Sequence, residues 1–97
     1  MNIFPLQRFT VIGNSMLPIL KEGQDVLVLC WFYVPKVGDI VAVNINGRDM
    51  VKRIQKARDR EYFVTGDNER ISTDSRKFGS IKRSQIIGKV IWYKQSL

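Results

Sequence analysis

The chain has 97 residues, of which 44% are hydrophobic and 26% are charged. This composition is typical of an ordinary globular protein and excludes a disordered segment, and the length predicts one small domain spanning residues 1–97. Sixteen Lys and Arg against nine Asp and Glu give a net charge of +7, which favours anionic surfaces but is also compatible with a role in solubility alone.

Several classes of chemistry are excluded by residues that the chain lacks. Histidine is absent, which rules out Ser-His-Asp and Cys-His catalysis and removes the commonest metal ligand. The single cysteine, Cys30, cannot form an internal disulfide and does not suffice for a structural zinc site. We therefore expect no metal or cofactor. The sequence has no run of five like charges and no zinc-finger or helix-turn-helix spacing, so no nucleic-acid partner is expected.

The longest apolar run, Val26–Val34, has nine residues, about half of the ~20 that a membrane-spanning helix needs. Only fourteen residues precede Ser15, and they do not have the pattern of a signal peptide or anchor. We expect a chain that is cytoplasmic or peripheral at a membrane. Trp31, Phe32 and Tyr33 within the run could contact a membrane or an extended substrate, although most of the run is expected to lie in the core.

Hydrophobic periodicity predicts strands rather than helices, because no apolar pattern keeps helical spacing beyond about two turns. The expected strands, in chain order, are Asp25–Val34, Asp39–Ile45, Arg48–Ile54, Glu61–Thr65 and Ile86–Tyr93. Asn46-Gly47 predicts a tight hairpin, since both residues tolerate positive φ. The result is a mostly β fold, a coiled sheet or a partly closed barrel.

Two polar segments interrupt this pattern. Gln55–Arg60 is interpreted as a basic connection between strands. The segment from Glu69 to Ser84 is too long for an ordinary loop and is therefore a candidate functional loop.

Ser15 stands in a constrained frame. Gly13, two residues earlier, permits backbone angles that other residues avoid, and Pro18 biases Leu17 away from helix. A serine held in this way at the end of a strand is suited to act as a nucleophile once a base is available. The alternative is an ordinary turn serine.

Lys52 is the best available base. Side chains alternate along a strand, so Lys52 points to the same side as Met50 and Ile54, whereas Arg53 is expected to face outward. Removal from water favours the neutral form of an amine, and only a neutral amine can accept a proton from serine. The alternative is a lysine whose stem follows Met50 and whose amine reaches water.

The glycine-bounded segment Gly66–Gly79 contains small polar residues together with acids and bases. Asp74 and Arg76 are expected to form an ion pair, and the Ser72 hydroxyl could orient an amine. Considered by itself, this segment is interpreted as a polar surface loop.

Together the three segments resemble the type I signal peptidase family of serine proteases. The resemblance rests on Gly-Asn-Ser-Met-Leu-Pro around Ser15, on Val-Lys-Arg-Ile around Lys52, and on Gly-Asp-Asn followed by Ser-Thr-Asp-Ser-Arg-Lys-Phe-Gly within residues 66–79. It runs from about residue 10 to residue 93. The Ser-Met-x-Pro element is shared with LexA-type self-cleaving proteins, whereas the Gly-Asp-Asn and Asp-Ser-Arg block points to signal peptidases.

The resemblance implies a signal-peptidase or LexA-like β fold, with Ser15 as the nucleophile and Lys52 as its general base. It also implies that Ser72 positions the amine while Asp74 and Arg76 brace the loop. An oxyanion hole would use the backbone N–H of Ser15. The preceding Gly13 and Asn14 are counted with these supporting residues.

The chain departs from the family pattern in three places. No N-terminal membrane anchor is expected from the residues before Ser15, Gln55–Arg60 replaces the usual Gly-x-Pro-Gly-Asp element, and Gly13 stands where some members carry a hydroxyl. This short, anchorless form is most similar to the nickel-type superoxide dismutase maturation proteases.

The sequence thus predicts a serine endopeptidase with a Ser-Lys dyad. It would remove N-terminal signal or propeptide segments from precursor proteins through an acyl-enzyme, with a precursor protein or peptide as its partner. Two alternatives stay open: a LexA-type domain that cleaves its own chain, and a non-catalytic basic binding module.

Overall fold

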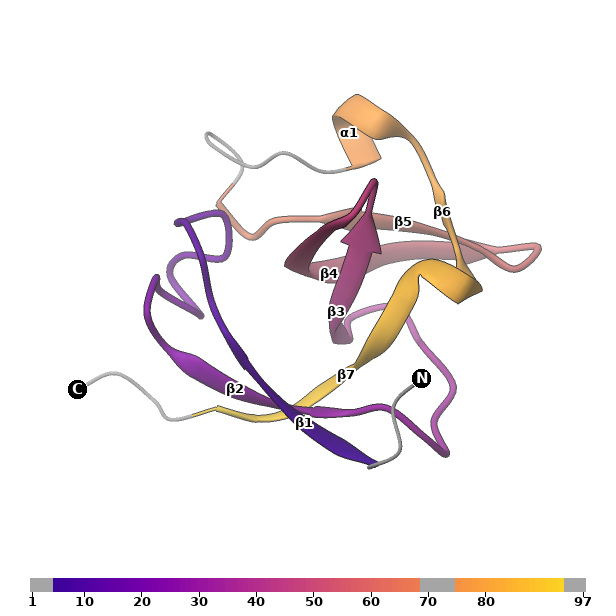
Figure 1. Cartoon of the computed structure of the whole chain (residues 1–97). Helices are drawn as coiled ribbons and strands as arrows, with labels where there is room; N and C mark the ends of the chain where they lie inside the picture. The colour runs from indigo at the N-terminus through magenta and orange to yellow at the C-terminus, as the bar shows by residue number, and fades with distance from the viewer. Residues whose placement is uncertain (1–4, 69–74, 94–97) are drawn as a thin grey trace.

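A computed structural model of the chain describes residues 5–68 and 75–93. Its strands form one antiparallel sheet with the spatial order β1-β2-β7-β3-β4-β5-β6 (Figure 1). The strands are β1 (Leu6–Thr10), β2 (Asp25–Leu29), β3 (Ile40–Ile45), β4 (Arg48–Arg58), β5 (Glu61–Thr65), β6 (Ile81–Lys82) and β7 (Ile86–Tyr93). One helical turn, α1 (Ser75–Phe78), and a 3-10 turn, η1 (Arg83–Gln85), precede β7. The mostly β fold expected from the sequence is confirmed.

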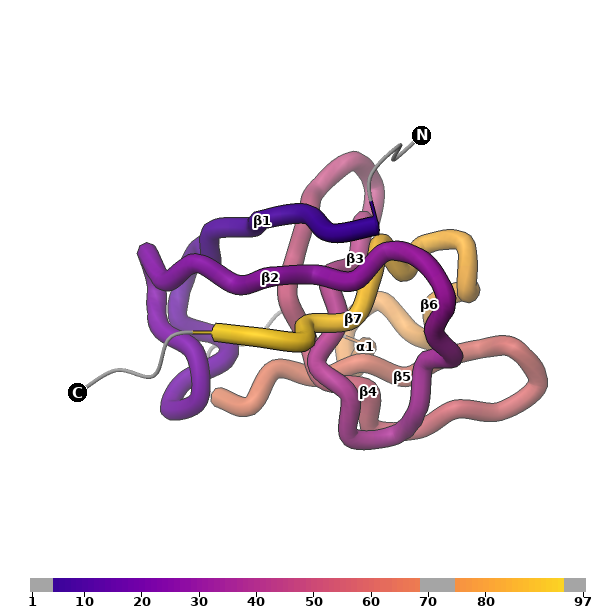
Figure 2. The backbone as a smooth tube through the Cα atoms, turned by 90° about the horizontal axis from the view of Figure 1, so that it is seen from below, coloured from indigo at the N-terminus to yellow at the C-terminus, as the bar shows by residue number. Residues whose placement is uncertain are grey.

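The sheet is coiled, and buried apolar side chains form two separate clusters. Figure 2 shows β1, β2 and β7 side by side, with β4 and β5 lying below them. One apolar cluster comprises Val11, Met16, Leu20, Val26, Val28, Ala42 and Val90. The other comprises Val41, Val43, Ile45, Ile54, Val64, Ile81 and Ile86. Because successive side chains of a strand point to opposite faces, β3 contributes Ala42 to the first cluster and Val41 and Val43 to the second.

The hairpin between β3 and β4 forms as expected. Asn46 and Gly47 have φ angles of 52° and 83°, the positive values that a two-residue hairpin turn requires. The turn fixes the pairing of Val41 with Lys52 and of Ile40 with Arg53. This register determines where the candidate base lies.

Two expected boundaries are wrong. The strand that begins at Asp25 ends at Leu29 instead of Val34, because the following residues leave the sheet and Phe32 takes a positive φ of 58°, which extended strands do not allow. The segment 55–60 is not a simple connection. β4 continues through Arg58 and pairs with β5 around a turn at Asp59 and Arg60. The last residues of β4 are exposed and mostly polar, so the alternation of apolar and polar residues that predicts a strand is missing there.

In the described part of the chain, no helix has the length and apolar character that crossing a membrane requires. Within the same residues, no group of three or more potential His, Cys, Asp or Glu ligands gathers around a point where a metal ion could bind.

Candidate active site

Ser15 lies in the loop that joins β1 to β2. Gly13 has a φ of 79°, and its N–H donates a hydrogen bond to the Glu22 carboxylate at 3.1 Å. Met16 and Leu20 are buried at 1% and 0% exposure, and the Leu20 N–H donates to the Met16 carbonyl. Ser15 itself is half-buried. The loop therefore holds the serine at the surface by anchoring the residues on either side of it.

Lys52 extends from β4 to this serine. Its amine donates a hydrogen bond to Ser15 Oγ at 3.0 Å, across 37 residues of sequence. The residue is only 3% exposed, so the alternative in which its amine reaches water is wrong. Ile54 and Met50 belong to the second apolar cluster or pack against it, as expected for strand neighbours of Lys52. The hydroxyl of a half-buried serine and the amine of a buried lysine thus meet at hydrogen-bonding distance.

Arg53 does not face outward freely as expected. Its guanidinium binds both carboxylate oxygens of Asp67, at 2.9 and 2.8 Å, and also donates to the Gly38 carbonyl at 2.8 Å. The Asp67 hydrogen bonds raise the pKa of Arg53. The expectation was wrong because strand alternation gives the direction of a side chain but not its partners.

Asp67 leads directly to a second set of contacts on the serine loop. The Asn68 backbone N–H donates to the Ser15 carbonyl at 2.8 Å, and its side-chain amide donates to the Asn14 carbonyl at 3.1 Å. Arg53, Asp67 and Asn68 therefore connect the strand of Lys52 to the backbone of Ser15. We call these three residues the brace. In the sequence, this region was marked only by the Gly-Asp-Asn motif of the family resemblance, which did not predict these contacts.

Two of the expected supporting residues, Ser72 and Asp74, lie outside the described residues, so the Asp74–Arg76 ion pair stays a prediction. Arg76 lies in α1. The neighbouring Ser75 is 3% exposed, and its hydroxyl accepts a hydrogen bond from the Val64 N–H at 2.9 Å. This contact ties α1 to β5. The N–H of Gly13 already donates to Glu22, so that group does not supply a free oxyanion donor.

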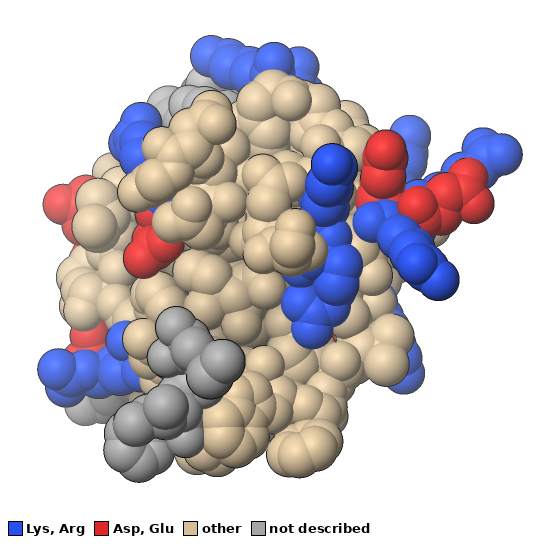
Figure 3. Space-filling model, turned by 45° about the vertical axis from the view of Figure 1, so that its right-hand side comes forward, with Lys and Arg blue, Asp and Glu red and all other residues tan. Residues whose placement is uncertain are grey.

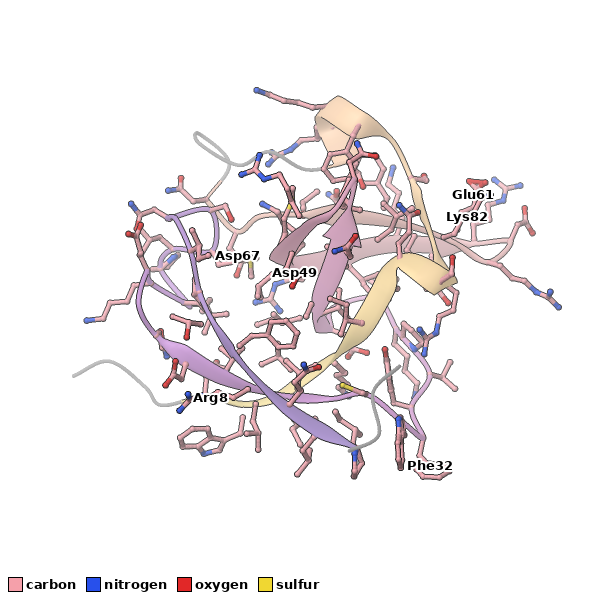
Figure 4. All side chains as sticks on the ribbon, viewed as in Figure 1. Arg8, Phe32, Asp49, Glu61, Asp67 and Lys82 are labelled. Atoms are coloured by element: carbon pink, nitrogen blue, oxygen red, sulfur yellow. The ribbon has the colours of Figure 1, made fainter. Side chains whose placement is uncertain are left out.

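A groove of about 680 Å³ leads to the serine and the lysine. One wall is formed by residues 8–15, including the end of β1, and the other by residues 48–52 of β4. Figure 4 shows Asp49 in the space between β1 and the β3–β4 hairpin.

Each wall of the groove includes part of a strand edge. β1 is the outermost strand of the sheet, and β4 pairs with β5 only from Arg53 onward. Within residues 5–68 and 75–93, no strand pairs with β1 or with residues 48–52 on the sides that border the groove. Such edges are templates for an additional strand.

A β sheet that carries a buried lysine against a loop serine, beside an open groove, has the arrangement of a peptidase. The chain belongs to the Peptidase S24-like family, whose sequence profile matches residues 6–91. It is similar to the signal peptidase IB proteins of Staphylococcus aureus strains N315, MW2 and COL, with 34% identity over 80 residues in each case. These alignments cover 79% of this chain and 42% of each relative, so the chain spans less than half of their length.

These matches confirm the resemblance to type I signal peptidases that the sequence motifs indicated. The narrower likeness to the nickel-type superoxide dismutase maturation proteases stays a prediction.

Proposed function

We propose that this chain is a serine endopeptidase in which Ser15 is the nucleophile and Lys52 is the general base. The observation that carries the proposal is the 3.0 Å contact between Lys52 Nζ and Ser15 Oγ, made by a lysine that is only 3% exposed. A nucleophile and a base within hydrogen-bonding reach are the first requirement of covalent catalysis by serine.

The proposed reaction begins with a neutral Lys52. Removal from water disfavours the charged ammonium form, and in the neutral form the same contact can run from the serine hydroxyl to the amine. Lys52 takes the hydroxyl proton as Ser15 Oγ attacks the peptide carbonyl. The resulting ammonium then gives the proton to the leaving amine, leaving an acyl-enzyme. Lys52 next activates a water molecule that releases the acyl group. The backbone N–H of Ser15 is the proposed oxyanion donor.

The substrate is proposed to be an extended peptide, because the groove lies between two strand edges. Four antiparallel pairings separate β1 from β4 in the sheet, so the two strands run in the same direction. Ser15 follows the end of β1, and Lys52 follows the first residues of β4. A peptide lying between them would have the same orientation relative to both strands, with backbone hydrogen bonds on each side.

The kind of precursor is a separate proposal. By analogy with the relatives named signal peptidase IB, we propose that the enzyme removes N-terminal signal or propeptide segments. The resemblance to signal peptidases further implies that small residues precede the cleaved bond.

The Val26–Val34 run suggested contact with a membrane, and such contact requires that side chains of the run are exposed. Val26 and Val28 are in the core, whereas Trp31 and Phe32 are exposed. Any contact with a membrane is therefore proposed for the second half of the run only.

The test is cleavage of a panel of precursor peptides by the purified chain, with the cut mapped by mass spectrometry. Ser15→Ala should abolish cleavage without changing the circular dichroism spectrum or the melting temperature, because it removes one half-buried hydroxyl. Ser84→Ala, at an exposed serine of η1, is the matched control and should cleave like the parent. A Ser15→Ala variant that keeps a rate within tenfold of the parent would refute the assignment.

A further inference from the structure

Asn68 contacts both peptide units that flank the proposed nucleophile. Its side-chain amide donates a hydrogen bond to the Asn14 carbonyl at 3.1 Å, and its backbone N–H donates to the Ser15 carbonyl at 2.8 Å. The Asn14 carbonyl and the Ser15 N–H belong to one peptide unit, and the Ser15 carbonyl begins the next one. A residue from a distant part of the chain therefore holds the backbone on both sides of the Ser15 Cα atom.

The first of these hydrogen bonds determines the direction of the Ser15 N–H. The peptide bond between Asn14 and Ser15 is trans and a peptide unit is planar, so its carbonyl and its N–H point in opposite directions. Because Asn68 binds the carbonyl, the N–H of Ser15 points away from Asn68, and the unit cannot rotate without breaking that bond. The bond also polarises the unit, which strengthens the N–H as a donor by roughly 10–30%.

The loop by itself holds this peptide unit less firmly. Within the loop, the Asn14 carbonyl accepts a second hydrogen bond from the Leu17 N–H, at the longer distance of 3.3 Å. Gly13 has no side-chain donor, and its N–H donates to the Glu22 carboxylate. The proposed oxyanion donor is the N–H of Ser15, so its orientation depends on a contact from outside the loop.

The support of Asn68 is shared with the proposed base. The preceding residue, Asp67, is bound at both carboxylate oxygens by Arg53, which follows Lys52 in β4. From the same strand, the Lys52 amine reaches Ser15 Oγ at 3.0 Å. The oxyanion donor and the base are therefore both positioned through β4.

We propose that Asn68 is a positioning residue, which orients the Ser15 N–H toward the oxygen of the substrate carbonyl while Lys52 takes the hydroxyl proton. This inference rests on the proposed peptidase function. The backbone N–H of Asn68 holds the serine, and the side-chain amide orients the oxyanion donor. Removal of the side chain should then leave the contact between Ser15 and Lys52 in place and weaken only the stabilisation of the tetrahedral intermediate.

The first experiment compares Asn68→Ala and Asn68→Asp with the parent in the cleavage of one precursor peptide. Asn68→Ala should lower kcat by about tenfold to a hundredfold and change KM less than about twofold, somewhat less than the loss of a direct oxyanion donor. Asn68→Asp keeps the shape of the side chain, but a carboxylate cannot donate to the Asn14 carbonyl, so kcat should fall at least as far. The pH midpoint of kcat/KM should be the same in Asn68→Ala as in the parent, because Lys52 is unchanged.

Gln55→Ala is the matched control. It removes another side-chain amide, from an exposed position in β4 at the base of the β4–β5 hairpin. Charged side chains project together from this hairpin on the right of Figure 3. The control should keep both kcat and KM within about twofold of the parent, as surface substitutions usually do.

A second measurement tests the oxyanion without turnover, with a peptide aldehyde that has the sequence before the cleaved bond. Ser15 Oγ bonds to the aldehyde carbon, the hydroxyl proton passes to Lys52, and the carbonyl oxygen becomes the anion that the Ser15 N–H stabilises. Asn68→Ala should weaken aldehyde binding by the same factor as it lowers kcat. The matching peptide alcohol has no carbonyl at that position and should bind both proteins equally.

The proposal would be overturned by a parent-like kcat in Asn68→Ala, or by a lower kcat with unchanged affinity for the aldehyde. A shifted pH midpoint in that variant would assign Asn68 to the base instead, and loss of the circular dichroism spectrum in both variants would assign it to folding. A parent that cleaves no peptide would refute the peptidase function and this inference with it. An active parent with a fully active Asn68→Ala variant would refute only the role of Asn68.

Discussion

The loops at the two ends of β2 are similar in composition, but they differ in which of their apolar side chains are buried. The loop before β2 contains Gly13, Pro18 and apolar residues, and it turns Met16 and Leu20 into the core. The loop after β2 contains a proline, a glycine and apolar residues as well, but it turns Phe32 and Val34 toward solvent.

What differs is how each backbone is anchored. Asn68 and Glu22 bind the serine loop close to Ser15, whereas hydrogen bonds hold the backbone of the later loop near its two ends, at Cys30 and at Gly38. Apolar composition therefore does not decide whether a loop joins the core. A fixed backbone is suited to hold a nucleophile, and a projecting one is suited to meet another surface.

The largest effect should come from removing the Lys52 amine, which contacts Ser15 in the loop before β2. Lys52→Arg and Lys52→Met should each lower kcat/KM at least about a thousandfold, since a guanidinium stays protonated and a thioether accepts no proton at neutral pH. Lys52→Met should be at least as stable as the parent in urea, because it replaces a buried amine with an apolar side chain of similar length. Appreciable cleavage by Lys52→Arg would contradict a role as general base.

The pH dependence tests the same amine without a mutation. Free lysine has a pKa of about 10.4, so the proposed mechanism requires a lower pKa at Lys52. The neutral amine is the active form, and therefore kcat/KM should rise tenfold per pH unit below that pKa and level off above it. NMR titration of the Lys52 amine should give the same midpoint. A rate that is independent of pH from 6 to 9, with an amine titrating near 10.4, would eliminate the dyad.

The two loops should respond differently when an apolar side chain is shortened. Leu20→Ala should lower the free energy of unfolding by about 2–5 kcal/mol, because it leaves a cavity in the first apolar cluster. Val34→Ala should change it by less than about 0.5 kcal/mol, because that side chain is 70% exposed. Urea titration of both variants measures the difference, and similar losses at the two positions would show that the later loop is packed in solution.

The brace should show coupling between its two charged members. Arg53→Ala and Asp67→Ala each break the same pair of hydrogen bonds, so the double variant should lose about 0.5–3 kcal/mol less than the sum of the single variants. Each single change should also lower kcat more than it alters KM, since Asn68 would no longer be held against the Ser15 backbone. Strictly additive losses of stability would mean that the two residues do not act together.

The smallest effect is expected at Tyr33. Its hydroxyl is buried and has no hydrogen-bond partner in the described part of the chain, and burial raises its pKa against the opposing charge of Arg83. The raised pKa means that folding favours the neutral hydroxyl. The contribution of Tyr33 to stability should then be constant below pH 10 and be lost as the pH rises through the pKa of the folded state. Tyr33→Phe should be neutral or stabilising by up to about 1 kcal/mol, and should remove the alkaline loss. Thermal unfolding between pH 8 and 11 measures both effects.

The sequence by itself determined the local features of this protein. Alternation of apolar side chains predicted most strands, Asn46-Gly47 predicted the hairpin that pairs β3 with β4, and the frames around Ser15 and Lys52 marked them as candidates. These features depend on neighbouring residues, whose backbone preferences and two-residue period act within a few positions. The absence of histidine likewise limits the available chemistry, whatever fold the chain adopts.

The tertiary structure decided which distant residues meet. Local period does not specify which strands become neighbours, so the contact between Ser15 and Lys52 and the attachment of Arg53 to Asp67 depend on sheet order and register. The apolar run shows the same limit, because it contains no charged residue or strand-breaking residue that marks where the strand ends. Only the pairing of β2 with β1 and β7, which ends at Leu29, divided it into a buried half and an exposed half.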